Sequence, residues 1–177
     1  FAGCNRVIEK QIFDQISSSI YLNSRSNLEA VKNLKSFKRI LYKNVYPQTD
    51  IEFLVSDIDG KARFKYNIIL HPGADESKVQ LLIDGSLKNT LTKDGYIEMQ
   101  TSLGVIEEQV PLSYELTKQG KQGCSIGARF RQIKEKIFGI AVDERDRRNT
   151  CVIDPLIWGS YFGGTLSESL NDMFLKK

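Results

Sequence analysis

The side chains in this sequence best suited to catalysis are one cysteine, one histidine and one aspartate. Cys124, His71 and Asp75 are of the types that form a thiol nucleophile, its general base and the group that orients the base. However, His71 lies in a Pro-Gly turn, and nothing in the spacing places Cys124 near it. A single histidine beside a turn is usually a solvated or packed side chain. We therefore predict no catalytic residue and no enzymatic activity.

Metal and cofactor sites are also not predicted. The run from Asp57 to Gly60 resembles the start of a calcium loop, but a third acidic ligand and the glutamate at the twelfth position are missing. Asp59-Gly60 is also typical of a hairpin turn. His71 is the only histidine and the cysteines form no CxxC pair, so no zinc ligand set is expected. The sequence has no phosphate-binding or dinucleotide-binding glycine motif.

The three cysteines leave two interpretations open. In an oxidising compartment, Cys4, Cys124 and Cys151 could form one disulfide, whose pairing the sequence does not define; otherwise all three are buried thiols. Phe1 to Cys4 is similar to the end of a lipoprotein signal, with Cys4 as the lipidated residue. A strand end and turn with an incidental cysteine is the favoured interpretation, because no apolar stretch precedes Phe1 in this sequence.

Composition is typical of a globular domain and argues against a nucleic-acid partner. Of the 177 residues, 41% are hydrophobic and 27% are charged, and the net charge is only +3. The basic residues are scattered among acidic ones. The longest apolar runs are much shorter than the roughly 20 residues that span a bilayer, so we expect no transmembrane segment.

The hydrophobic pattern predicts β-strands for most of the chain. In the clearest segment, Ala62–Leu70, apolar and polar residues alternate with a period of two, which suits a strand and not a helix. Asp59-Gly60, Asp84-Gly85 and Asp94-Gly95 are expected to be hairpin turns with positive φ. Further strands are predicted over 7–13, 37–46, 51–55, 79–83, 87–91, 96–99, 104–109, 113–116, 124–133, 136–142 and 151–158. Loops are predicted at 17–19 and 23–27, followed by a short helix over 28–31 capped by Asn27.

Roughly ten short strands predict an all-β, antiparallel β-sandwich-like domain of two sheets with a minor helix. We assign this domain to residues 1–155, with an open N-terminal boundary, and residues 156–177 to a linker or to the start of a propeller blade. Thr165–Lys177 is too short and polar to form its own core. This segment is expected either to pack back on the sandwich or to begin another module.

Several motifs, in order, resemble a known domain family. They are Tyr42–Ile51 (YKNVYPQTDI), His71–Val79 (HPGADESKV), Thr101–Gly104 with Glu108–Pro111, and Val152–Pro155 followed by Trp158, Tyr161 and Phe162-Gly163-Gly164. Together they resemble the uncharacterised β-rich domain that precedes SBBP-type β-propeller repeats in bacterial surface and secreted proteins. Gln48 and Glu76 depart from the pattern, which has glycine and proline there.

The resemblance implies a bacterial envelope, surface or extracellular location, often with type IX secretion, and no catalytic activity. We expect a structural and interaction module that caps or orients a following β-propeller through Trp158, Tyr161 and Phe162, although packing within the sandwich is an equal alternative for these rings. The expected partners are adjacent domains of the same polypeptide, with envelope proteins or glycans as further candidates. The alternative function is binding of a carbohydrate or protein ligand in an adhesin or secreted hydrolase.

Overall fold

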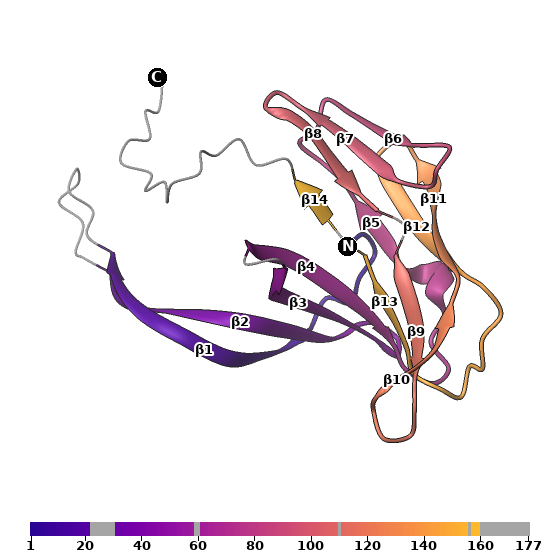
Figure 1. The fold of residues 1–177 in the computed structure, drawn as a ribbon, viewed down its shortest axis with the longest axis horizontal. Helices are drawn as coiled ribbons and strands as arrows, with labels where there is room; N and C mark the ends of the chain where they lie inside the picture. The colour runs from indigo at the N-terminus through magenta and orange to yellow at the C-terminus, as the bar shows by residue number, and fades with distance from the viewer. Residues whose placement is uncertain (22–30, 59–60, 110, 156, 160–177) are drawn as a thin grey trace.

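The computed structural model describes residues 1–21, 31–58, 61–109, 111–155 and 157–159, and the regular secondary structure of these residues is almost entirely β-strand (Figure 1). The strands are β1 (Glu9–Tyr21), β2 (Val31–Tyr46), β3 (Thr49–Ile58), β4 (Lys61–Leu70), β5 (Gln80–Leu82), β6 (Lys88–Leu91), β7 (Ile97–Thr101), β8 (Gly104–Glu108), β9 (Leu112–Leu116), β10 (Gln122–Ile126), β11 (Ala128–Lys134), β12 (Ile137–Val142), β13 (Cys151–Asp154) and β14 (Ile157–Gly159). Within these ranges the one helix is the 3-10 turn η1 (Glu76–Lys78), and no helix there is long and apolar enough to cross a membrane.

The strands form three sheets in which the pairs are antiparallel. The largest sheet has seven strands in the order β1-β2-β3-β4-β13-β9-β10. A second sheet has the order β11-β12-β5, and a third has the order β14-β8-β7-β6. The predicted all-β, antiparallel class is therefore confirmed. Three sheets are present instead of the expected two. β6, β7, β8 and β14 form a sheet of their own and do not pair with β5, β11 or β12.

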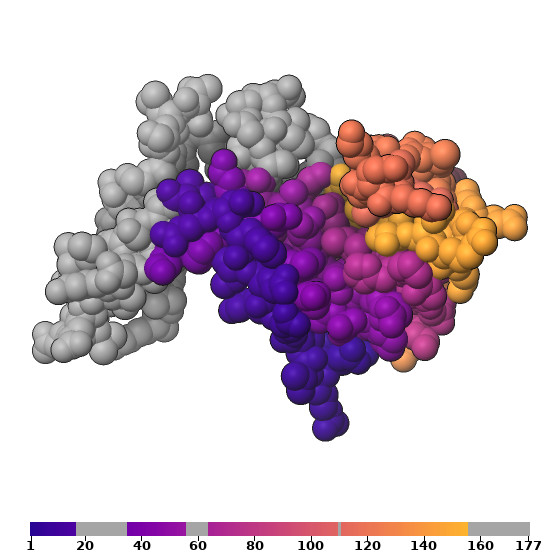
Figure 2. Space-filling model, turned by 90° about the horizontal axis from the view of Figure 1, so that it is seen from below, coloured from indigo at the N-terminus to yellow at the C-terminus, as the bar shows by residue number. Residues whose placement is uncertain are grey.

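The seven-stranded sheet joins the two ends of the sequence. Its first four strands follow one another as hairpins, and β13 is then inserted between β4 and β9. Val152 in β13 lies opposite Ile69 on one side and Tyr114 on the other. In Figure 1 the β1–β2 hairpin extends as an arm away from the other two sheets. At the opposite end the β9–β10 hairpin and the loop 143–150 lie together, as Figure 2 also shows, and the Leu116 amide donates to the Thr150 carbonyl over 2.8 Å.

The core lies between one face of the seven-stranded sheet and the two smaller sheets. Ile68 and Ile153 in the large sheet are fully buried, as are Phe138 in β12 and Ile97 in β7. Because successive residues of a strand point to opposite faces, Tyr66, Ile68 and Leu70 lie on the same side of β4. All three are buried, as the period-two pattern predicted.

Two local predictions in the N-terminal part are wrong. Ser17–Ser19 lies inside β1, and Val31, the end of the predicted helix, begins β2. Pairing of β1 with β2 supplies the backbone hydrogen bonds that overrule the loop preference of serine. The predicted loop over 23–27, Asn27 and most of the helix fall outside the described residues, as do Asp59 and Gly60.

The predicted strand over 124–133 is two strands in different sheets. β10 ends at Ile126 and β11 begins at Ala128, so the chain changes sheet at Gly127. A Cβ atom at Gly127 would lie 2.1 Å from the Asp143 Oδ2 atom. The Asp143 amide also donates to the Gly127 carbonyl over 2.8 Å. A side chain at Gly127 would therefore require the exposed Asp143 carboxylate, which pairs with Arg129, to move.

The two described Asp-Gly pairs have different roles. Asp94-Gly95 connects β6 to β7 as a hairpin, in agreement with the prediction. Asp84-Gly85 instead carries the chain from β5 to β6, which belong to different sheets, so the hairpin predicted there is wrong. In both pairs glycine has the positive φ, 88° at Gly85 and 86° at Gly95, whereas neither aspartate does. These turns thus use the freedom of glycine alone.

Candidate functional site

The three residues considered for catalysis have separate partners. His71 Nε2 lies 2.8 Å from the Asp50 carboxylate, which also accepts the Asn44 amide over 2.7 Å. Asp75 accepts the amide and hydroxyl of Ser77 and thereby caps η1. Cys124 is exposed on β10, at an edge of the large sheet. The histidine thus holds the turn between β2 and β3, and the aspartate holds a helix end.

The thiols differ in environment and form no disulfide. Cys4 is partly buried, Cys124 is exposed and Cys151 is fully buried, and all three are free. Burial raises the pKa of the Cys151 thiol to about 11, so this side chain packs as an apolar group. Asp57 and Ile58 are part of β3, and the residues that the structure describes contain no cluster of three or more histidine, cysteine, aspartate or glutamate side chains that could hold a metal ion.

An uncovered apolar surface on the large sheet is the feature most relevant to function. Along β4, the exposed fraction rises from 0% at Ile68 to 5% at Tyr66 and 57% at Phe64, although the three share one face. In β3, Ile51 is 1% exposed and Val55 is 40% exposed. The same sheet face is therefore core near the smaller sheets and solvent-exposed further along β3 and β4.

Aromatic rings occupy the boundary between the covered and uncovered parts. Phe53 stacks on Phe64 with centroids 5.6 Å apart and planes 14° apart, and it meets Tyr42 edge-on at 5.8 Å. On the covered side, Phe1 packs edge-on against Phe53 and Tyr66, at 6.5 and 6.0 Å. The cluster combines residues from the N-terminus and from three strands. We call its uncovered extension, Ile12, Ile40, Phe53, Val55 and Phe64, the distal apolar face.

The distal apolar face is too shallow for a small-molecule pocket. The groove in it has a volume of about 50 Å³ and includes Phe37 and Lys38 at its border. Pockets that enclose a small ligand usually have a volume of about 300 Å³ or more. A flat apolar surface of this kind is instead typical of contact with another polypeptide.

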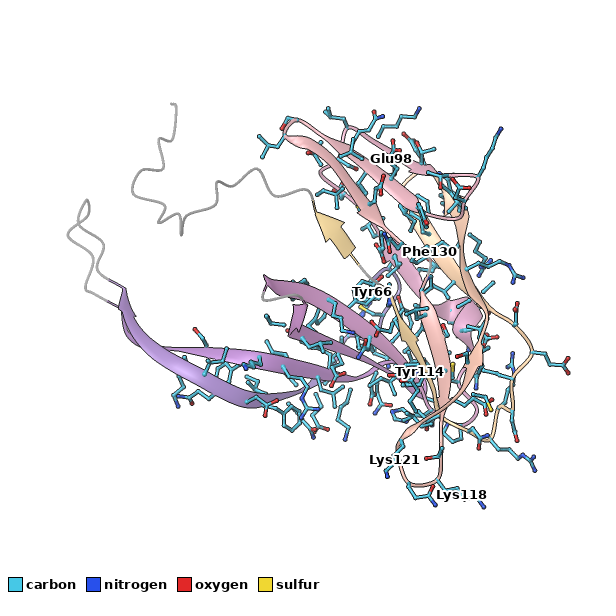
Figure 3. All side chains as sticks on the ribbon, viewed as in Figure 1. Tyr66, Glu98, Tyr114, Lys118, Lys121 and Phe130 are labelled. Atoms are coloured by element: carbon cyan, nitrogen blue, oxygen red, sulfur yellow. The ribbon has the colours of Figure 1, made fainter. Side chains whose placement is uncertain are left out.

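A larger hollow lies near the β9–β10 hairpin, and one of its two basic side chains is already paired. It measures about 340 Å³ and is lined by residues that include Lys118 and Arg148. Arg148 contacts both carboxylate oxygens of Asp146, and this hydrogen-bonded pairing lowers the pKa of Asp146 to about 2. Figure 3 places Lys118 and Lys121 at the exposed tip of the hairpin.

A buried polar contact links the large sheet to the sheet that contains β14. The Tyr66 hydroxyl donates to the Glu108 carboxylate, and both side chains are about 5% exposed. Burial raises the pKa of Glu108 and outweighs the opposite effect of the Tyr66 hydrogen bond. Burial, followed by the charge of Glu108, raises the pKa of Tyr66 well above its usual range. In Figure 3 Tyr66 lies at this junction between the sheets.

The other face of the large sheet carries both charged and apolar side chains. Glu52 accepts hydrogen bonds from Arg39 and Asn67, and Lys65 pairs with Asp154 over 2.7 Å. Phe13 and Leu54 lie opposite Arg39 on the neighbouring strands and share this face with it. This face therefore combines ion pairs with apolar contacts.

Of the residues predicted to make inter-domain contacts, the structure describes only the backbone of Trp158. This residue lies in β14, opposite Glu107 of β8. The Trp158 side chain, Tyr161 and Phe162 lie outside the described residues, so their predicted contacts stay a prediction. Sequence reasoning missed Phe53 and Phe64 as surface residues. Their alternating pattern identified the apolar face, but it carries no signal for where the covering layer ends.

The fold and this surface define an antiparallel, sandwich-like all-β domain with an uncovered apolar sheet extension. A family comparison matches residues 1–156 to DUF7948, a domain of unknown function, and the chain belongs to this family. No curated protein and no solved structure matches the sequence.

Proposed function

We propose that this domain is a non-enzymatic structural and interaction module that fixes the direction of the polypeptide following it. The proposal depends on one observation: β14, the last strand among the described residues, is paired into a sheet of the domain. Ile157 lies opposite Glu108, and Glu108 is held by Tyr66 of the large sheet. The chain thus leaves the described domain from a strand that belongs to the four-stranded sheet and is linked through Glu108 to the seven-stranded sheet.

The contacts of the ionisable groups support a structural rather than a catalytic role. His71 binds Asp50, Glu108 binds Tyr66, and Arg148 binds Asp146. Each of these carboxylates stabilises a structural feature: Asp50 the turn between β2 and β3, Glu108 the junction between two sheets, and Asp146 the loop 143–150. None of these pairs lies at the distal apolar face.

The wider setting is part of the same proposal. From the resemblance of the motifs to domains that precede SBBP-type propellers, we propose that the protein lies at the bacterial surface or outside the cell and that a propeller is the following module. Secretion by the type IX route is the export pathway proposed with this location. Three free thiols do not argue against it, because no disulfide is needed to stabilise a core of this size.

Ligand binding through exposed aromatics is the second candidate function. The exposed ring of Phe64 favours it, but Phe53 and Phe64 stack on each other instead of lying side by side as a platform for a sugar. A glycan array probed with the 177-residue chain tests this alternative, and binding to a defined glycan that Phe64→Ala abolishes would replace our proposal.

Hydrogen exchange on the full-length parent protein tests the main proposal. We expect the amides of residues 157–159 to be protected and Tyr66→Phe to weaken that protection, because it removes the hydroxyl that holds Glu108. Tyr42→Phe is the matched control, because its ring lies in the same aromatic cluster and no contact with Glu108 is seen. Free-peptide exchange rates at 157–159 in the wild type would refute the proposal.

A further inference from the structure

The distal apolar face lacks a covering layer among the described residues, and its exposure is concentrated in three side chains. Phe64 is 57% exposed, Ile12 is 41% exposed and Val55 is 40% exposed. Pairing of Ile12 with Ile40, of Ile40 with Phe53 and of Val55 with Phe64 makes the surface continuous across four strands. A continuous apolar surface of this kind usually marks a contact site.

The chain leaves the described domain on the side toward which this face is directed. Tyr66 and Phe64 point to the same side of β4, and Tyr66 reaches Glu108, the residue paired with Ile157 of β14. Figure 1 shows β14 above β4 in that view. Phe64 is two residues from Tyr66, which is only about 7 Å along a strand.

The segment after β14 has the length and composition to cover the face. Residues 160–177 could span on the order of 60 Å when extended, so reach is not limiting. Leu166, Leu170, Met173 and Phe174 recur at the spacing that places apolar residues on one side of a helix. The segment is too polar to form a core alone, and a preformed apolar surface would provide the partner that it needs.

The polar residues of the segment fit the same arrangement. At the helical spacing of Leu166, Leu170 and Phe174, Glu168 and Asp172 fall on the opposite side, which faces solvent when the apolar side docks.

We propose that residues 160–177 dock on the distal apolar face, with Leu166, Leu170 and Phe174 against Phe53 and Phe64. The inference rests on the proposed function, because β14 must lead the chain out on this side. To the proposed function, this inference adds the surface on which the chain binds after it leaves β14. The distal apolar face is thus a binding surface for the segment that follows β14. The chain is held once where β14 pairs with β8 and again where this segment contacts β2, β3 and β4.

Hydrogen exchange of the 177-residue chain tests the docking. In the wild type we expect protection within residues 160–177, and Phe64→Asp should accelerate exchange there by about tenfold or more. Leu103→Asp is the matched control, because Leu103 is 85% exposed in the turn between β7 and β8. Amides of β13 report whether Phe64→Asp disturbs the fold. Leu170→Asp, which leaves the sheet unchanged, should have the same effect as Phe64→Asp.

The outcomes separate the two proposals. Unprotected residues 160–177 beside protected residues 157–159 would overturn the docking and leave the proposed function intact. Fast exchange in both segments would overturn both. Protection of the arm that depends on protein concentration, with a dimer in sedimentation, would overturn the docking by showing that a second copy covers the face.

Discussion

At the scale of single residues, the buried Glu108 makes stability depend on pH. Because its pKa is raised in the folded state, the folded protein binds more protons than the unfolded chain between the usual glutamate pKa and the raised value. Stability should therefore fall as pH rises through that window. Glu108→Gln keeps an acceptor for Tyr66 but removes the charge, and it should abolish this decrease in urea titrations at several pH values.

Glu107→Gln provides the control for this prediction. Glu107 is the neighbour of Glu108 in β8, but its side chain is exposed. The Glu107→Gln variant should therefore show the same pH dependence of stability as the wild type. If Glu108→Gln and the wild type lose stability equally over the window, the carboxylate is not the group responsible.

Gln48 is the other informative single residue. It has a φ of 57° in the turn after Pro47, in the left-handed region that costs about 1–2 kcal/mol for a residue with a side chain. Glycine removes this cost but loses more entropy on folding, about 0.5–1 kcal/mol. Gln48→Gly, the residue that the family-like motif has there, should raise the free energy of unfolding by up to about 1 kcal/mol. Gln48→Ala keeps the strain, and an equal gain from it would contradict this explanation.

At the scale of elements, the arm should be less stable than the centre of the sheet. β1 pairs only with β2, and none of its described side chains belongs to the buried core. β13 has partners on both sides and three buried residues. Amides of β1 should therefore exchange on the order of a hundredfold faster than those of β13. Similar rates in the two strands would mean that the arm unfolds only with the whole domain.

The elements also show how far sequence reasoning reaches. Period-two patterns located β4 and most other strands, because alternation follows directly from strand geometry. The change of sheet at Gly127 was missed, because this single residue is all that separates β10 from β11. Asp84-Gly85 was misassigned because a turn motif does not specify which sheet the next strand joins. The apolar side of β3 and β4 was likewise predictable, whereas the exposure of Phe64 depends on how far the other sheets extend.

At the scale of the whole molecule, one core should make the described domain unfold as a unit. Phe138 is fully buried among residues from all three sheets. Phe138→Ala should lower the free energy of unfolding by about 3–5 kcal/mol, because it removes a large apolar side chain and leaves a cavity. Val7→Ala, at a position that is 89% exposed, should change it by less than about 0.5 kcal/mol. Both changes in the free energy of unfolding are to be measured by urea denaturation followed by circular dichroism.

The position of β13 has a consequence for biosynthesis. β4 and β9 lie on either side of a gap that only Cys151–Asp154 fills, so the large sheet cannot close until the ribosome has made nearly the entire domain. Until then both flanking strands have unpaired edges that invite association with other chains. Nascent chains should thus depend on chaperones until this late strand emerges, and translation pauses before Cys151 should increase aggregation.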